Sequence, residues 1–217
     1  MPRIARSAVR GFAYHVFNRG NDKRQLFAQD LDYRLFLRLM RSAPRCADIG
    51  LLAYCLLPNH WHLVAMPHDL EALSAYVQWV TGTHGLRWRR SYGRDAPGHV
   101  YQGRFKSVPI LTDQHLLTVL RYVEANPVRA GLVTSARAWA WSSRAVAADS
   151  AAPPLATWPW PVPSNWDRQL DQPQPADQLD AIRRAIRRGT PLEDAGAKAP
   201  RLTPSEPPPG TPQAELF

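Results

Sequence analysis

The feature that most constrains this chain is an apolar run at residues 56–67 that is interrupted by two histidines. Its Leu, Trp and Val content and its flanking prolines predict a buried β-strand. Successive side chains of a strand point to opposite faces of a sheet, so His60 and His62 project together and Trp61 projects away. The two imidazoles would lie about 6–7 Å apart along the strand. Such a pair can share a divalent metal ion, but a complete site needs a third ligand.

The charge balance of the chain favours a polyanionic partner. The 217 residues carry a formal net charge of +9, and the sequence pI is near 10.1. Nucleic acid is the first partner to consider and an anionic membrane surface the second. We expect no signal peptide and no transmembrane span, because no long apolar stretch is visible. Cys46 and Cys55 lack metal-site or redox spacing, which is typical of small buried residues in a reducing cytoplasm.

Hydrophobic periodicity predicts alternating strands and helices. Strands are expected at 11–18, 49–56, the histidine run and 105–111, and helices at 27–43, 68–88 and 113–125. Pro58-Asn59 should close a hairpin between the second strand and the histidine strand, and Pro109 places the last strand at a sheet edge. We expect Asp30 to cap the first helix, and Thr112 or Asp113 to cap the third.

The order of these elements predicts an α+β fold of the ferredoxin-like, split βαβ type. Its antiparallel sheet would carry helices on one face and leave the other face for a ligand. Composition changes after residue 150, where most of the 21 prolines lie. We therefore expect a domain at 1–150 and a proline-rich extension at 151–217, with one short basic helix at 178–188 and disorder after residue 190.

A tyrosine near the end of the third helix is the candidate reactive group. Tyr122 and Asn126 are four residues apart, so they share a helical face if the last turn stays helical. A tyrosine phenol can attack a phosphodiester if a metal ion or a cationic group neutralises the charge that builds on the phosphate oxygens. His60, His62 and the side-chain oxygen of Asn126 could hold such an ion.

Four segments of the chain resemble the motifs of a known family. LPNHWH matches the His-hydrophobe-His (HUH) motif, and RYVEANPVRAGLV closely matches a tyrosine-helix motif. HVFNRGNDKRQLF and YQGRFKSV also look like motifs of that family, in the same order along the chain. The family is the single-tyrosine HUH transposases, especially the REP-associated tyrosine transposases of bacteria. The resemblance covers roughly residues 10 to 145 and implies an HUH endonuclease type of fold.

The resemblance also implies a role for each matching residue. Tyr122 would be the nucleophile, His60 and His62 metal ligands, and Asn126 the third ligand to Mg²⁺ or Mn²⁺. Such enzymes cut single-stranded DNA at hairpins from repeated palindromes, leaving a 5′-phosphotyrosine and a free 3′-OH. A monomer is implied, which would act in the bacterial cytoplasm and at the nucleoid when bound to DNA. No nucleotide cofactor is expected, because transesterification retains the bond energy and no ATP-binding Gly-rich loop is visible.

Several alternatives stay open from the residues themselves. Arg19, Arg104 and Lys106 flank strand ends and could contact phosphate or hairpin bases, or could be ordinary solvated charges. The arginines of the 178–188 helix could form a nucleic-acid patch or only a solvated face. Five histidines lack a partner pattern and are interpreted as structural or surface residues: His15, His68, His84, His99 and His115.

Two other functions would use the same residues. A decayed or domesticated family member could bind DNA hairpins without cutting them. A zinc hydrolase could use the histidine pair to activate water, with no need for Tyr122. Metal-dependent cleavage of a hairpin oligonucleotide separates the first alternative from the transposase, and dependence on Tyr122 separates the second.

Overall fold

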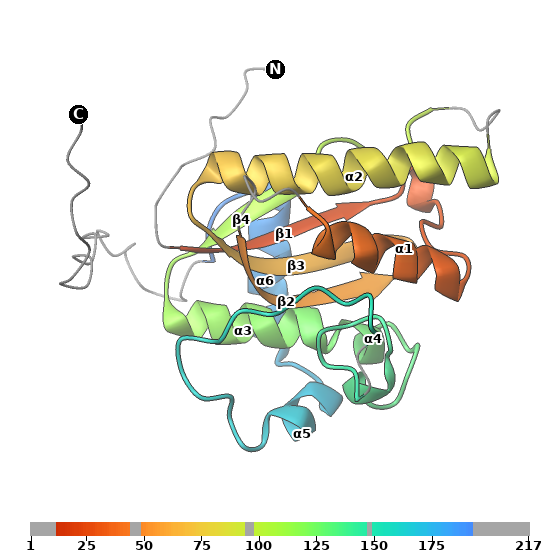
Figure 1. Cartoon of the computed structure of the whole chain (residues 1–217). Helices are drawn as coiled ribbons and strands as arrows, with labels where there is room; N and C mark the ends of the chain where they lie inside the picture. The colour runs from red at the N-terminus through yellow and green to blue at the C-terminus, as the bar shows by residue number, and fades with distance from the viewer. Residues whose placement is uncertain (1–11, 44–48, 94–97, 147–148, 193–217) are drawn as a thin grey trace, which may run out of the picture.

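Four antiparallel strands form a sheet in the order β2-β3-β1-β4 (Figure 1). The strands are β1 (Ala13–Arg19), β2 (Ile49–Leu57), β3 (His60–Pro67) and β4 (Lys106–Ile110). The computed structural model describes residues 12–43, 49–93, 98–146 and 149–192. All four predicted strands are present in these ranges.

The hairpin and the edge strand lie where the sequence predicts them. β2 and β3 pair through a tight turn at Pro58 and Asn59, with Leu57 opposite His60. β4 pairs with β1 at the edge of the sheet. Proline cannot donate the N–H that a central strand needs, so Pro109 is tolerated at this edge.

The helices complete the predicted element order. They are α1 (Asp30–Arg41), α2 (Leu70–Tyr92), α3 (Asp113–Glu124), α4 (Asn126–Arg129), α5 (Trp166–Asp171) and α6 (Ala176–Arg188), with 3₁₀ turns η1 (Asn21–Lys23) and η3 (Ala136–Ala138). The order strand-helix-strand-strand-helix-strand, followed by α3, confirms the α+β class and the split βαβ arrangement. The sequence does not predict α5, because six residues are too few to show a helical period.

The caps of two helices differ in how well the sequence predicts them. Thr112 caps α3, as expected, and its side chain accepts a hydrogen bond from the His115 backbone N–H. The predicted cap of α1 is wrong by one residue: Gln29 is the N-cap and Asp30 is the first helical residue. The carboxylate of Asp32 accepts from the Gln29 backbone N–H and closes a capping box, which moves the helix start.

Helices cover both faces of the sheet, which corrects the expectation that they lie on one face (Figure 1). α1 and α2 pack on one face, in a core that includes Phe36 of α1 and Trp61 of β3. α3 packs on the other face, in a core that includes Leu52 and Val64. The strands carry apolar side chains on both faces, so a face without helices would expose these side chains to water. The second face is open at one end, where the pocket described below lies.

The C-terminal part of the described chain belongs to the second of these cores. Trp166 and Leu170 of α5 and Ile182 of α6 are buried with the residues of α3. The guanidinium of Arg121 on α3 also donates to backbone carbonyls of Gln169, Gln172 and Pro173. These contacts fix α6 against the sheet. The division of the chain at residue 150 stays a prediction.

No helix among the described residues is long and apolar enough to span a membrane. Cys55 is a free, buried thiol, as expected. Cys46 and residues 193–217, which make up most of the segment predicted to be disordered, lie outside the described residues.

Candidate catalytic pocket

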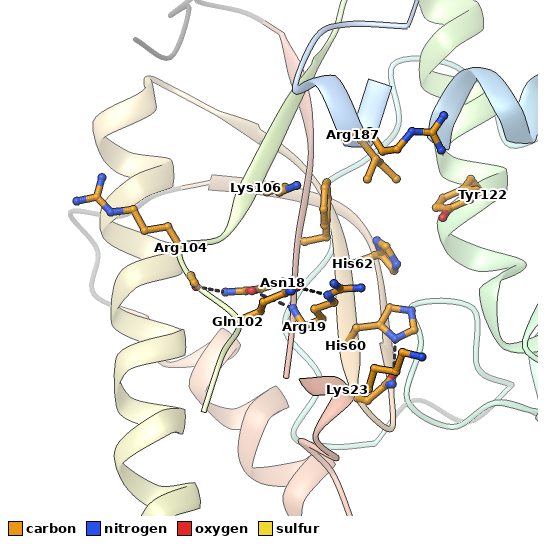
Figure 2. Close-up of a pocket in the computed structure, with 14 residues that line it drawn as sticks. Asn18, Arg19, Lys23, His60, His62, Gln102, Arg104, Lys106, Tyr122 and Arg187 are labelled. Atoms are coloured by element: carbon orange, nitrogen blue, oxygen red, sulfur yellow. Dashed lines mark hydrogen bonds between the residues drawn. The ribbon is translucent and has the colours of Figure 1, made fainter. Parts of the chain in front are cut away.

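A pocket of about 800 Å³ opens where β1 ends and where β3 and β4 begin (Figure 2). Its lining brings together His60, His62 and Tyr122, which come from β3 and α3. All three basic residues expected to contact DNA, Arg19, Arg104 and Lys106, also line it. Residues that are far apart in the sequence therefore meet at one site.

The strand register explains how the two histidines reach this pocket. His60 and His62 alternate with Trp61, which is buried on the opposite face against Phe36. The two imidazole rings lie side by side, with centroids 5.1 Å apart and planes nearly perpendicular. The common face expected from the two-residue spacing is therefore present in the structure.

Each of these histidines has one ring nitrogen engaged in a hydrogen bond. Nδ1 of His60 lies 2.7 Å from Oδ1 of Asn59, and this oxygen only accepts, so Nδ1 carries the hydrogen and Nε2 keeps its lone pair. Nδ1 of His62 lies 2.9 Å from Nε2 of His15. His15, interpreted from the sequence as structural or surface, is thus in contact with a pocket histidine.

Burial keeps the three imidazoles neutral at physiological pH. Loss of hydration, together with the charge of Arg129, lowers the pKa of His60 to about 4 and that of His15 to about 3. Burial, followed by the neighbouring His15 and His60, also holds the pKa of His62 well below its usual value. Neutral imidazole is the form that binds a metal ion.

Two of the three expected metal ligands are placed to bind a metal ion. His60 and His62 each keep a ring nitrogen outside the hydrogen bonds described above. Asn126 is buried, its Nδ2 atom has no hydrogen-bond partner, and it does not line the pocket. α3 ends at Glu124 and Asn126 begins α4, so the unbroken helix that would align it with Tyr122 is interrupted. No group of three or more His, Cys, Asp or Glu side chains in the described ranges could hold a metal ion.

Tyr122 lies between a guanidinium and the imidazoles. Its ring is 5.7 Å from that of His62 and 5.8 Å from that of His15, centroid to centroid, and meets both edge-on. The guanidinium of Arg129 lies over the ring at 4.0 Å from the centroid and donates two hydrogen bonds of 3.2 Å to the Tyr122 backbone carbonyl. A cation over the face of an aromatic ring is attractive, so Arg129 holds the ring in place.

The pocket is strongly cationic. Lys23 and Arg187 line it in addition to the three basic residues already named, and no described lining residue is Asp or Glu. Lys23 follows β1 in the η1 turn, in a left-handed backbone conformation with φ of 59°. Figure 2 shows Arg19 and Lys23 beside His60, whereas the Arg104 side chain points away from the histidines. This arrangement of charges suits a phosphate backbone.

Sequence reasoning missed three residues of the pocket region, for two reasons. His15 and His62 contact each other across two strands that are 47 residues apart, and the pairing partner of β1 was not predicted. Arg187 belongs to a basic helix, and helical spacing does not show which side of that helix faces the pocket. No sequence pattern marks Lys23 as a pocket residue. The alternation of side chains along β1 was the one available signal, since it places His15 and Phe17 on the same face.

A family model and two solved structures are similar to this chain. A family model described as Transposase IS200 like matches residues 8–126, more than half of the chain. The structure of a REP-associated tyrosine transposase bound to a REP hairpin matches with a TM-score of 0.51 and 19% sequence identity, over 66% of this chain and 82% of that chain. A proposed transposase from Deinococcus radiodurans matches with a TM-score of 0.37 and 13% identity, over 57% of this chain and 95% of that chain. No curated protein matches the sequence significantly.

Proposed function

The chain belongs to the IS200-like transposase family, and from this premise we propose that it cleaves and rejoins single-stranded DNA at hairpins, with Tyr122 as the nucleophile. The observation that supports this proposal is that Tyr122, His60 and His62 line one pocket with five basic residues. A solved transposase of similar fold was determined with a REP hairpin, which supports hairpin DNA as the partner.

The proposed reaction is a transesterification at phosphorus. The phenol oxygen of Tyr122 forms a bond to the scissile phosphorus, and the bond from phosphorus to the 3′ oxygen breaks. The phenol proton passes to solvent, and the departing 3′ oxygen takes up a proton to become a free 3′-OH. The phosphate stays on the enzyme as a 5′-phosphotyrosine, and attack by another 3′-OH reverses the step and rejoins DNA. Bond energy is retained throughout, so no nucleotide cofactor is consumed.

The residues around Tyr122 prepare this attack. Arg129 fixes the ring by stacking and by its bonds to the backbone carbonyl, which makes the reaction effectively intramolecular once DNA is bound. Arg19, Lys23, Lys106 and Arg187 place positive charge around the site that the phosphates would occupy. These contacts would position DNA without reading its sequence.

His60 and His62 would hold a divalent ion, Mg²⁺ or Mn²⁺, through the ring nitrogens that their hydrogen bonds leave available. Asn126 is the proposed third ligand, and its side-chain oxygen would have to turn toward the histidines when the site is loaded. When bound, the ion would supply stabilisation of the negative charge that develops on the phosphate oxygens. His60 is neutral and its Nε2 keeps the lone pair, so no proton has to be displaced from that nitrogen.

We also propose that the active unit is a monomer that works at the nucleoid. The nucleophile, the two histidines and the basic residues all come from a single chain. A second copy is therefore not needed to complete the pocket. Light scattering of the protein with and without hairpin DNA tests this, and a dimer formed only with DNA would contradict it.

The deciding experiment is detection of a covalent protein–DNA adduct. A synthetic hairpin with single-stranded flanks, taken from palindromic repeats of the encoding genome and labelled at its 3′ end, is incubated with protein and Mn²⁺. Wild-type protein should carry the label through a denaturing gel, because the downstream fragment is joined through its 5′ phosphate. Tyr122→Phe removes one oxygen, so it should bind the hairpin normally and give no adduct.

The other outcomes identify the alternatives. Hairpin binding by wild-type protein with neither cleavage nor adduct would show a binding protein without activity. Cleavage by Tyr122→Phe at the wild-type rate would show that water or another residue is the nucleophile. His60→Ala and His62→Ala should each abolish adduct formation, and full wild-type activity in excess EDTA would refute the metal role of both histidines.

A further inference from the structure

His62 has a buried partner on the neighbouring strand. Nε2 of His15 lies 2.9 Å from Nδ1 of His62, and the two rings stack with centroids 5.1 Å apart and an interplanar angle of 25°. His15 is 2% exposed and His62 is 5% exposed. Water therefore cannot readily replace either partner, and the bond is a fixed part of the folded protein.

The sheet and the surrounding rings hold this pair in place. β1 and β3 are antiparallel, with Phe17 opposite His62 and Val64 opposite His15, so the two histidines are diagonal neighbours on one face. The Phe17 ring contacts both imidazoles, at centroid distances of 5.1 Å to His15 and 5.8 Å to His62. The Tyr122 ring also contacts both imidazoles, edge-on. Rotation of either imidazole would disturb these contacts.

Either histidine could donate this hydrogen bond, and the direction decides whether His62 keeps a lone pair for a metal ion. A neutral imidazole has one N–H and one nitrogen lone pair. If His15 donates, His62 carries its own hydrogen on Nε2 and has no lone pair left for a metal ion. If Nδ1 of His62 donates, its Nε2 keeps the lone pair and can act as a ligand.

We propose that His15 is a positioning residue, which accepts the hydrogen bond from Nδ1 of His62 and thereby fixes the metal-binding tautomer and the ring orientation of His62. This inference rests on the proposed function, because it requires His62 to be a ligand. Metal-binding histidines commonly donate their second ring nitrogen to an acceptor. His60 does so to Asn59, and His15 gives His62 the matching partner. Both acceptors are uncharged, which keeps the pocket free of negative charge where phosphate would bind.

Three variants separate positioning from general packing. His15→Phe keeps a ring of similar size and removes the acceptor. His15→Gln restores an acceptor, because its side-chain oxygen reaches a similar distance from the backbone as Nε2. His84→Phe is the matched control: His84 is 4% exposed and bonded to the Tyr101 hydroxyl, and it does not line the pocket.

The first measurement is the tautomer of His62 in the full chain without metal. ¹⁵N chemical shifts of the imidazole nitrogens should show hydrogen on Nδ1 and a lone pair on Nε2 in wild-type protein. His15→Phe should convert His62 to a mixture of tautomers. A hydrogen on Nε2 of His62 in wild-type protein would overturn the proposal directly.

The second measurement is the affinity for Mn²⁺, determined by electron paramagnetic resonance. His15→Phe should weaken Mn²⁺ binding roughly 10–100-fold, while hairpin affinity stays within about twofold because His15 offers no charge to phosphate. His15→Gln should recover most of the Mn²⁺ affinity. His84→Phe should be less stable than wild-type protein but should keep the wild-type Mn²⁺ affinity. Wild-type protein that binds no Mn²⁺ would overturn the metal role in the proposed function together with this inference. Unchanged Mn²⁺ affinity in His15→Phe, in a protein that binds Mn²⁺ and forms the adduct, would overturn this inference alone.

Discussion

Neutral, buried histidines make the stability of this protein sensitive to acid. Burial lowers the pKa of His15 to about 3 and those of His60 and His84 to about 4, from an ordinary value of 6.5. Between these limits the unfolded chain binds protons that the folded chain cannot bind. The free energy of unfolding should therefore be highest above pH 6.5. Below pH 6.5 it should fall by at most about 1.4 kcal/mol per pH unit for each histidine.

Thermal melts between pH 7.5 and pH 5 test this dependence. The melting temperature of wild-type protein should fall steadily below pH 6.5. His84→Phe removes one of the histidines that must be protonated on unfolding, so its melting temperature should fall less steeply, whatever its value at pH 7.5. A melting temperature that is constant over this range would contradict the burial of neutral imidazoles.

At the scale of single residues, the sequence predicts a site through spacing and motifs. The common face of His60 and His62 follows from the two-residue period of a strand, which is a local property. Tyr122 follows from the tyrosine-helix motif. His15 could not be assigned, because its role depends on which strand lies beside β1 and in which register. For Asn126 a local pattern is present but misleading, because its spacing from Tyr122 is helical and the helix is interrupted before Asn126.

At the scale of elements, α6 brings a cation from the C-terminal part of the chain to the pocket. Ile182 and Ala185 are buried in the core beside α3, so one face of the helix is fixed and Arg187 extends from it to the pocket lining. Amphipathic spacing predicts a helix at 178–188 but not the surface on which it docks. Docking depends on α5, whose short length leaves no periodic signal, and on the bonds from Arg121.

Arg187→Gln should weaken hairpin binding and make it less dependent on salt. Loss of one phosphate contact should lower the slope of log affinity against log salt by about 0.7 to 0.9. Arg184→Gln is the matched control, because Arg184 lies on the same helix and lines a separate small hollow. Fluorescence anisotropy at several salt concentrations measures both slopes. Equal reductions in the two variants would indicate a diffuse charge effect rather than a contact in the pocket.

At the scale of the whole molecule, the predicted α+β fold is correct and the predicted distribution of helices is not. The order of strands and helices follows from local patterns and is sufficient to predict the split βαβ arrangement. Whether helices cover one face of the sheet or both depends on contacts between the strands and helices that are distant in the sequence. Trp166 shows this: its indole N–H donates to the buried carboxylate of Glu124, 42 residues away, a contact that no local pattern contains.

Two truncations test how much of the chain the fold needs. A chain ending at residue 192 should keep the melting temperature and hairpin affinity of the full chain, as the composition beyond 193 predicts. A chain ending at residue 150 should lose much of its stability or aggregate, because removal of Trp166, Leu170 and Ile182 exposes the core around α3. Circular dichroism melts compare the three lengths. A stable, hairpin-binding chain of 150 residues would show that the domain does end there.

The shape and the charge of the pocket predict which form of DNA the molecule prefers. Tyr122 is half-buried on α3, and its ring lies against the imidazole of His62. We therefore expect a phosphate to reach it only on a strand that has left the duplex. We expect the basic residues around the opening to attract any DNA and the pocket itself to select unpaired nucleotides. A hairpin with single-stranded flanks should therefore bind at least roughly tenfold more tightly than the same palindrome as plain duplex, at physiological salt. The hairpin without flanks should bind nearly as weakly as the duplex, because its phosphates remain outside the pocket. Anisotropy titrations of the three DNAs with Tyr122→Phe protein measure this without cleavage, and equal affinities would place the DNA on the basic surface and not in the pocket.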